Sequence, residues 1–253
     1  MTAPIEILAQ SFAAERPRYT ADLVFIPGLW CGSLAWGAVI GFLAHRGWNC
    51  TALELVPQVA SAGWQDHLAG LDRHLAAYPD PPVLIGHDAG ATLVLALPAP
   101  ARARVALAPL LPQACHAALL SWRAPLSLRW HLSRRAMMPQ LSGRLRRRLL
   151  GDAALRDCPP VSPSLLRDLA ALDLQRLAAT PAPTLIVSAA EDSIVAPAQI
   201  EKLATRLAAS HISAAGAPHA LLSAPGWDKR TGDIHRWLIK AIGASLLVPE
   251  DDE

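Results

Sequence analysis

The sequence predicts an α/β protein with a mostly parallel central sheet covered by helices on both faces. Short apolar runs, suited to buried strands, alternate along the chain with longer segments whose apolar residues recur at helical spacing. Apolar residues make up 52% of the 253 residues, which is enough for a substantial core. Together these observations indicate a folded α/β domain rather than a disordered chain.

The expected elements follow this alternation in chain order. The segments with strand patterns are Ile5–Phe12 (an edge strand), Ala21–Ile26, Trp48–Leu53, Val83–Ile85, Arg104–Ala108, Pro183–Ser188 and His211–Ala214. The segments with helical spacing are Leu34–Arg46, Trp64–Tyr78, Ala91–Leu97, Pro197–Leu207 and Trp227–Ile242. The acidic tail Val248–Glu253 is expected to fray.

Residues 111–180 differ from the rest of the chain in pattern. This segment is rich in Leu, Ala and Arg, shows no strand pattern, and is interrupted by Pro125, Pro139 and Pro159-Pro160. We therefore expect residues 1–110 and 181–253 to form the α/β core. Residues 111–180 are expected to form a helical cap inserted between two strands of the sheet.

The most informative motif is Gly86-His87-Asp88-Ala89-Gly90, which lies between an expected strand and an expected helix. Glycines at the first and last positions of this G-x-D-x-G pattern suit a strained turn that packs closely against its neighbours. The strand, tight turn and helix resemble the nucleophile elbow of the α/β-hydrolases. Asp88 occupies the central position, where the esterases and lipases of that fold carry serine.

The resemblance to the α/β-hydrolases covers nearly the whole chain outside the expected cap. In that superfamily the nucleophile, the acid and the histidine follow in this order, each just after a sheet strand. The resemblance therefore implies Asp88 as the nucleophile, Asp192 as the acid and His219 as the base. Loops at the carboxyl ends of parallel strands converge, so these residues would meet in space.

Other residues compete for these roles. Glu191 is an alternative acid, and His211 and His235 are alternative bases, although their places in a strand and in the terminal helix are more typical of structural residues. Asp88 could instead bond its own backbone as a turn aspartate. His87 is interpreted as a packing residue.

Backbone N–H groups are expected to form an oxyanion hole. The resemblance implies the N–H of Ala89 as one donor, and that of Leu29 or Trp30, in the loop after the second expected strand, as the other. Many relatives carry His-Gly where this chain has Pro27-Gly28. Backbone donors do not depend on that side chain, so the hole is expected to form.

An aspartate nucleophile indicates a particular chemistry. A carboxylate is already ionised at neutral pH and can displace a leaving group from saturated carbon. Water activated by His219, with Asp192 orienting it, would then hydrolyse the alkyl ester of Asp88. The Asp-nucleophile branch of the superfamily (haloalkane dehalogenases, fluoroacetate dehalogenases and epoxide hydrolases) works in this way. The expected function is hydrolysis of an epoxide or of a halogenated or otherwise activated alkyl small molecule, without a metal or organic cofactor.

The residues that this branch uses to hold its substrates are not all at the expected positions. Ala89 stands where haloalkane dehalogenases usually have tryptophan and fluoroacetate dehalogenases have arginine. The tyrosines, Tyr19 and Tyr78, lie outside the segment in which epoxide hydrolases place theirs. Each remaining pocket candidate is more typical of ordinary packing when taken singly. These candidates are Trp30, Trp122, Trp130 and His131.

Two further functions stay open. The motif differs in one residue from the Gly-His-Ser-Ala-Gly of ordinary esterases, so the chain could belong to an esterase- or thioesterase-like lineage in which aspartate replaced serine. A non-catalytic homologue that binds a ligand is the other alternative. An intact Asp192 and His219 argue against it, because a site without turnover needs neither a base nor a residue that orients it.

Charge and hydropathy bear on partners and location. No Asp or Glu occurs between Ala89 and Gly151, while Arg134, Arg135 and the run Arg144–Arg148 are basic. This surface is expected to be solvated, or to recruit an anionic substrate, a carrier protein or an acidic surface; nothing suggests nucleic acid. With no secretory signal, no apolar run of membrane length and scattered cysteines, a cytoplasmic protein is expected.

Overall fold

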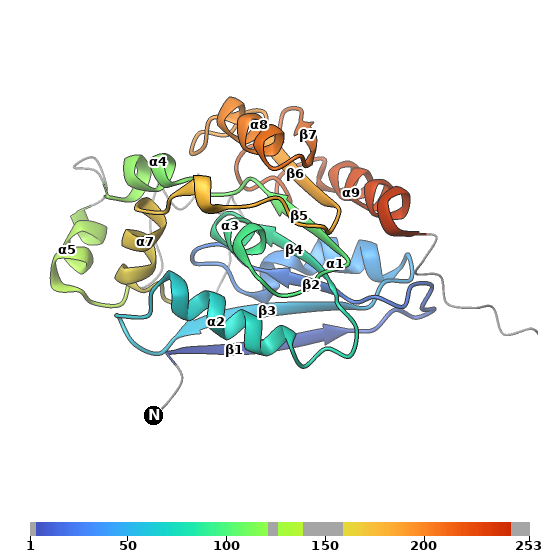
Figure 1. The fold of residues 1–253 in the computed structure, drawn as a ribbon, viewed down its shortest axis with the longest axis horizontal. Helices are drawn as coiled ribbons and strands as arrows, with labels where there is room; N and C mark the ends of the chain where they lie inside the picture. The colour runs from blue at the N-terminus through green and yellow to red at the C-terminus, as the bar shows by residue number, and fades with distance from the viewer. Residues whose placement is uncertain (1–3, 121–125, 139–158, 244–253) are drawn as a thin grey trace, which may run out of the picture.

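The computed structural model describes residues 4–120, 126–138 and 159–243, and at the centre of this part of the chain lies a seven-stranded sheet (Figure 1). The strand order is β1-β3-β2-β4-β5-β6-β7. The strands are β1 (Ile5–Phe12), β2 (Leu23–Ile26), β3 (Cys50–Pro57), β4 (Val83–His87), β5 (Ala103–Leu107), β6 (Thr184–Ala189) and β7 (Ser210–Ala214). The predicted α/β class is confirmed.

The sheet is parallel except at one edge. Strand β1 pairs with β3 in antiparallel register, with Ile5 opposite Pro57, whereas every other neighbouring pair is parallel. Strands β2, β4 and β5 are buried almost throughout, as expected of central strands that are covered on both faces. The edge strand β1 is mostly exposed, and Ile5 is its one buried residue.

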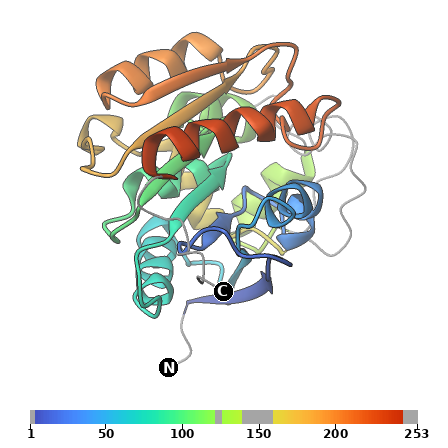
Figure 2. The same ribbon diagram turned by 90° about the vertical axis from the view of Figure 1, so that its right-hand side faces the viewer.

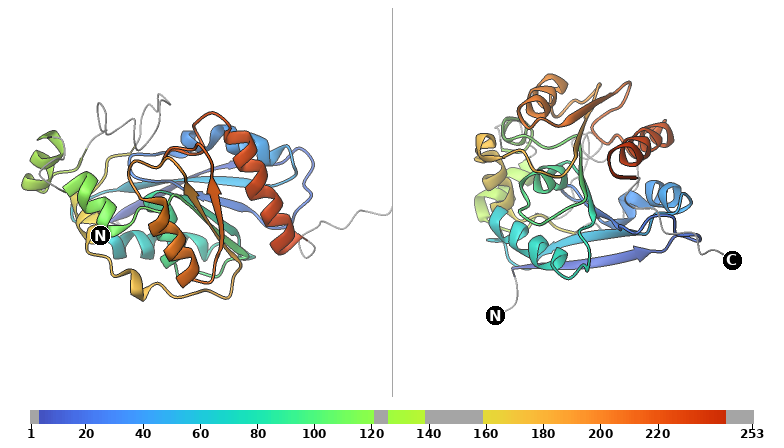
Figure 3. Two further views of the ribbon diagram at one scale, coloured as in Figure 1. Left: turned by 90° about the horizontal axis from the view of Figure 1, so that it is seen from above. Right: turned by 45° about the vertical axis from the view of Figure 1, so that its right-hand side comes forward.

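Two hydrophobic cores cover the two faces of the sheet. Helices α2 (Trp64–Leu75), α3 (Ala89–Ala96) and α8 (Pro197–Arg206) bury apolar residues in one core. Helices α1 (Gly37–Ala44), which follows η1 (Ser33–Trp36), and α9 (Trp227–Ile242) bury theirs in the other. Figures 2 and 3 show α1 and α9 together on one side of the sheet and α2 and α3 on the opposite side. The predicted arrangement of helices on both faces is confirmed.

The described residues between β5 and β6 form several helices joined by irregular stretches. These helices are α4 (Pro112–Cys115), η2 (His116–Leu120), α5 (Leu126–Arg134), α7 (Pro163–Ala170) and η3 (Leu174–Arg176). One pairing departs from the expectation of no strand structure: Met138 and Val161 form an isolated antiparallel bridge. Pro125, Pro139 and the arginines 144–148 lie outside the described residues, as does the tail 248–253.

Two contacts join this segment to the start of α2 and to the turn before it. The Asp168 carboxylate on α7 accepts a hydrogen bond from the backbone N–H of Trp64 at 2.8 Å, and Ser162 Oγ donates to the carbonyl of Ala62. The carboxylate therefore caps a helix N-terminus whose N–H groups have no partner within their own helix. That residues 111–180 act as a cap over the site stays a prediction.

Candidate active site

Asp88 sits in a strained turn at the carboxyl end of β4. Its backbone has φ +54° and ψ −122°, a conformation that residues with a side chain rarely adopt. The neighbouring strand holds this turn, because the Asp88 N–H donates to the carbonyl of Leu107 at 3.0 Å and the Asp88 carbonyl accepts from the N–H of Leu110 at 3.1 Å. The turn therefore projects one side chain at the edge where the parallel strands end.

The two glycines of the motif allow this turn to pack. A Cβ on Gly86 would lie 2.3 Å from the carbonyl oxygen of Gly90, and a Cβ on Gly90 would lie 2.3 Å from the carbonyl oxygen of Ile26. Both clashes are with backbone atoms, which cannot rotate away as a side chain could. The spacing G-x-D-x-G thus reflects the close contact of β2, β4 and α3.

We expect Gly90→Ala to destabilise the protein by at least about 2 kcal/mol, the scale of an overpacked core. The matched control is Gly41→Ala on the exposed side of α1, where a Cβ would meet no atom within 4 Å. That variant should gain about 0.5–1 kcal/mol from helix propensity. Urea unfolding measures both changes, and equal effects of the two substitutions would refute the packing argument.

The structure brings Asp88, His219 and Asp192 together, although 131 positions separate the first two. Nε2 of His219 lies 3.2 Å from Oδ1 of Asp88, and Nδ1 of His219 lies 2.7 Å from Oδ2 of Asp192. All three side chains are almost completely buried. Oδ1 of Asp192 accepts N–H hydrogen bonds from Ile194 and Val195 at 2.7 and 2.9 Å, which fixes the carboxylate that orients His219.

The competing residues lie elsewhere. Glu191 is exposed, while its neighbour Asp192 contacts the histidine. His211 contacts the hydroxyl of Ser188, and His235 accepts a hydrogen bond from the indole of a buried tryptophan. The structural interpretation of these two histidines therefore agrees with their contacts.

The second oxygen of the Asp88 carboxylate faces the loop after β2. Oδ2 accepts a hydrogen bond from the backbone N–H of Leu29 at 2.8 Å. Among the described contacts, the backbone N–H of Trp30 does not donate to this carboxylate. Gly28 permits the approach, since a Cβ there would lie 2.7 Å from both Cβ and Oδ2 of Asp88. The Ala89 N–H belongs to the first turn of α3, where N–H groups have no carbonyl partner within the helix.

The charges of Asp88 and His219 support each other. Burial alone would lower the pKa of His219, but its hydrogen bonds to Asp192 and Asp88 and the charges of both carboxylates outweigh burial and raise the pKa to about 9. Burial alone would raise the pKa of Asp88, but the hydrogen bond and charge of His219 lower it overall, with help from the Leu29 N–H. At neutral pH the pair is a carboxylate and an imidazolium.

This ion pair predicts how stability changes with pH. The pKa of His219 rises from 6.5 to about 9 on folding, so its contribution is complete below pH 6.5 and is lost as the pH rises toward 9. The free energy of unfolding should therefore fall across this window. In His219→Gln this part of the slope should disappear. Urea unfolding of both proteins at pH values of about 6, 7.5 and 9 tests this, and parallel slopes would contradict it.

His87 has a contact that sequence reasoning missed. Its Nε2 donates to the carbonyl oxygen of His219 at 2.9 Å, so the residue before Asp88 anchors the loop that carries the histidine. Burial, followed by the nearby charge of His219, lowers the pKa of His87 and keeps it neutral. The packing interpretation is therefore incomplete, and no local pattern could have indicated a bond over 132 positions.

The predicted pocket residues separate in space. Trp30 is buried and lines a small cavity beside the Asp88 loop, and its Nε1 donates to the carbonyl of Met138 at 3.3 Å. Trp130 is 54% exposed on α5, with its ring packed edge-on against His131, and neither residue lines that cavity. Trp122 lies outside the described residues. No helix in the part of the chain that the structure describes could span a membrane.

A strand, strained turn and helix that present a buried acid, followed by a second acid after β6 and a histidine before the last helix, define a hydrolase of the α/β type. The sequence model of the alpha/beta hydrolase family matches residues 23–227, and the chain belongs to this family. A search of the curated proteins returns no match.

Several solved structures share the fold. A monoacylglycerol lipase from Paleococcus ferrophilus has 19% sequence identity and a TM-score of 0.66, with 93% of this chain and 99% of that chain covered. Est1E from Butyrivibrio proteoclasticus, solved with ferulic acid bound, has 12% identity and a TM-score of 0.64, with 94% and 96% covered. The thioesterase domain from the curacin biosynthetic pathway has 17% identity and a TM-score of 0.60, with the same coverage of 94% and 96%. At these identities the likeness shows the fold alone.

Proposed function

We propose that the chain is a cofactor-free hydrolase in which Asp88 attacks an epoxide or a halogenated or otherwise activated alkyl small molecule. One observation carries the proposal: the Asp88 carboxylate bridges the base and the oxyanion loop. Oδ1 lies 3.2 Å from Nε2 of His219, and Oδ2 lies 2.8 Å from the N–H of Leu29. A serine hydroxyl has one oxygen and could not occupy both positions.

The first step forms an alkyl ester. Oδ1 of Asp88 attacks saturated carbon, the bond to the leaving group breaks, and the leaving group takes the bonding electron pair. The new ester carbonyl is then Cγ–Oδ2, which already lies against the Leu29 N–H. The donors that would stabilise the later tetrahedral intermediate are thus in place before the chemistry begins.

The second step needs a neutral His219. Esterification removes the charge of Asp88 and its hydrogen bond to Nε2, which are two of the causes that raise the pKa of His219. The pKa of His219 therefore falls, the imidazolium releases its proton, and Nε2 can accept a proton from water. Water attacks Cγ, the alcohol leaves, and the carboxylate is restored.

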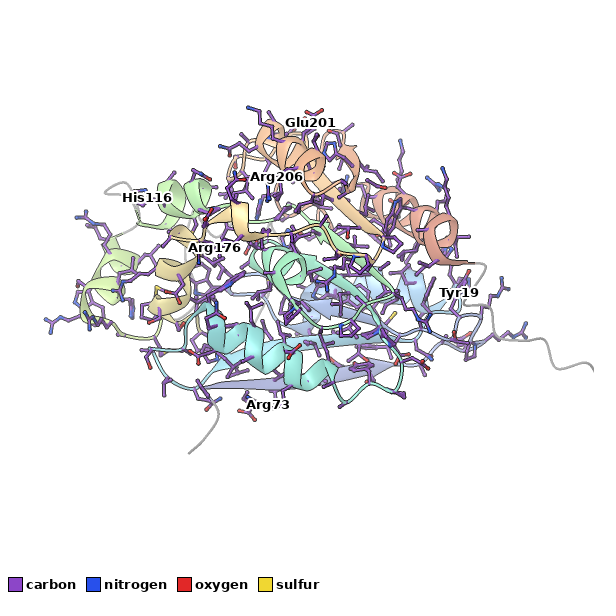
Figure 4. All side chains as sticks on the ribbon, in the orientation of Figure 1. Tyr19, Arg73, His116, Arg176, Glu201 and Arg206 are labelled. Carbon is purple, nitrogen blue, oxygen red and sulfur yellow. The ribbon has the colours of Figure 1, made fainter. Side chains whose placement is uncertain are left out.

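The site best suits a leaving group that departs as a stable anion. Tyr19 stacks on Trp48 at the end of the molecule opposite to α4 and α7, so it does not supply a proton at the site (Figure 4). The indole of Trp30 already donates to Met138. A halide needs no proton on departure, whereas an opened epoxide oxygen would have to take the proton that the imidazolium of His219 releases, so halogenated substrates make the smaller demand on the site.

Cleavage of an ester or thioester is the second candidate. The chain shares its fold with a monoacylglycerol lipase and a thioesterase domain, and its motif differs in a single residue from the serine elbow. Under this alternative the native protein would be a descendant of such enzymes. A gain of ester hydrolysis in Asp88→Ser would support that origin.

Oxygen labelling tests the proposal. In a single turnover in ¹⁸O-water with enzyme in excess over a bromoalkane substrate, the oxygen of the product alcohol should come from Asp88 and be ¹⁶O. The label should appear in the Asp88 carboxylate. Direct incorporation of ¹⁸O into the product during the first turnover would show that water attacks the substrate itself, and would overturn the covalent mechanism.

A further inference from the structure

A small cavity adjoins the candidate active site. It has a volume of about 30 Å³, and its lining includes Gly28, Leu29 and Ala89, the backbone beside the Asp88 carboxylate. Other lining residues come from β3, α2 and α7. Among the described residues that line it, the side chains are apolar apart from the thiol of Cys31, the indole of Trp30 and the imidazole of His67.

His67 is a buried histidine in which one of the two ring nitrogens already forms a hydrogen bond. Its side chain lies on α2 and the residue is 2% exposed. Nδ1 lies 2.7 Å from the carbonyl oxygen of Gly63; because a carbonyl only accepts, Nδ1 carries the hydrogen. Nε2 has no hydrogen-bond partner among the described residues. Nε2 is not sealed away from solvent, and because His67 lines the cavity this nitrogen is available to a ligand there.

The neutral ring makes Nε2 an acceptor. Burial is the main cause that lowers the pKa of His67, and the nearby charges of Asp66 on its own helix and Asp168 on α7 only partly oppose it. With its hydrogen on Nδ1, a neutral imidazole presents a lone pair at Nε2. Nε2 therefore suits a hydroxyl or N–H group of a ligand, and cannot stabilise a halide or a carboxylate.

The ring is held rigidly. Asp66 accepts the N–H of Gly63 at 2.8 Å, and Asp168 accepts the N–H of Trp64 at 2.8 Å, so the first turn of α2 is fixed from two directions. The carbonyl of Gly63, which orients the imidazole, belongs to that turn. Such support is what a recognition group requires, because its geometry is set before the ligand arrives.

We infer that His67 recognises the substrate, and that the substrate carries a hydroxyl or N–H donor on the part remote from the reacting carbon. The donor binds Nε2 of His67 in the cavity, while the reacting carbon lies at Asp88. The identity of the reacting end rests on the proposed function; the binding of a donor to His67 does not.

A pair of probes tests the inference. 4-Bromobutan-1-ol carries a terminal hydroxyl and 1-bromobutane lacks it. In a His219→Gln background, which retains the ester, intact-protein mass gives the rate of alkylation. His67→Leu should slow alkylation by the hydroxylated probe about fivefold, the size of one net hydrogen bond, and change the rate with 1-bromobutane less than about twofold. His67→Gln, whose amide oxygen can replace Nε2, should restore the rate with the hydroxylated probe.

An equilibrium measurement separates this inference from the proposed function. Butane-1,4-diol is added to native protein labelled with ¹⁵N-histidine, and the Nε2 resonance of His67 is followed by NMR. His67→Leu assigns this resonance, because the resonance is missing from the spectrum of that variant. A saturable shift of the assigned resonance supports recognition even where no probe alkylates Asp88, an outcome that would contradict the proposed function alone. The role of His67 would be overturned if His67→Leu alkylated with both probes as fast as the protein that keeps His67. It would also be overturned if butane-1,4-diol caused no shift of the His67 Nε2 resonance.

Discussion

Asp88→Asn is expected to lower kcat/KM by at least about 10⁴-fold, the scale on which loss of a covalent nucleophile acts. The amide has the shape of the carboxylate and can still accept the Leu29 N–H, but it has no charge and is a poor nucleophile. The substitution therefore removes the chemistry with little change in packing. Steady-state kinetics on the substrate found by the labelling experiment measure the loss.

A matched substitution controls for the change of residue type. Asp173 also accepts a backbone N–H through its carboxylate, but lies on an exposed turn beside η3, and Asp173→Asn should keep the native rate. Deamidation of the introduced asparagine would regenerate the aspartate, so Asp88→Ala, which cannot deamidate, is measured as well. Activity above about 1% of native in Asp88→Ala would contradict a nucleophilic role for this residue.

His219→Gln is expected to separate the two halves of the reaction. Alkylation needs the Asp88 carboxylate and should continue, whereas ester hydrolysis loses its base and should slow by about 10³- to 10⁴-fold. Rapid mixing should therefore show one equivalent of leaving group released per enzyme, followed by almost no turnover. His211→Gln is the matched control, because His211 contacts Ser188 rather than the carboxylates and should leave steady-state turnover unchanged.

The sequence was most informative where local pattern and geometry coincide. A buried strand, a glycine pair and an apolar helix specify the turn at Asp88, because few residues fit the contacts of Gly86 and Gly90. The resemblance to the α/β-hydrolases singled out Asp88, Asp192 and His219, and the convergence of loops at the ends of parallel strands predicted the contacts that the structure shows. Boundaries were less exact: the predicted strand 48–53 begins at Cys50 and continues to Pro57, where it pairs with β1.

Contacts between distant segments were not predictable in the same way. The bond from the indole of Trp30, a predicted pocket residue, to the Met138 carbonyl spans 108 positions. The anchor from His87 to the loop of His219 and the open nitrogen of His67 also depend on which segments pack together. No periodicity records such pairings, because each involves a single side chain and the backbone of another element.

The most direct test of covalent catalysis by Asp88 is the mass of His219→Gln after exposure to epoxides, haloalkanes, haloacids and activated esters. We predict a mass gain equal to the alkyl group of one compound, located by peptide mapping on the peptide that contains Asp88. Absence of any adduct in His219→Gln, with a compound that the native protein does turn over, would contradict an alkyl-enzyme intermediate at this residue.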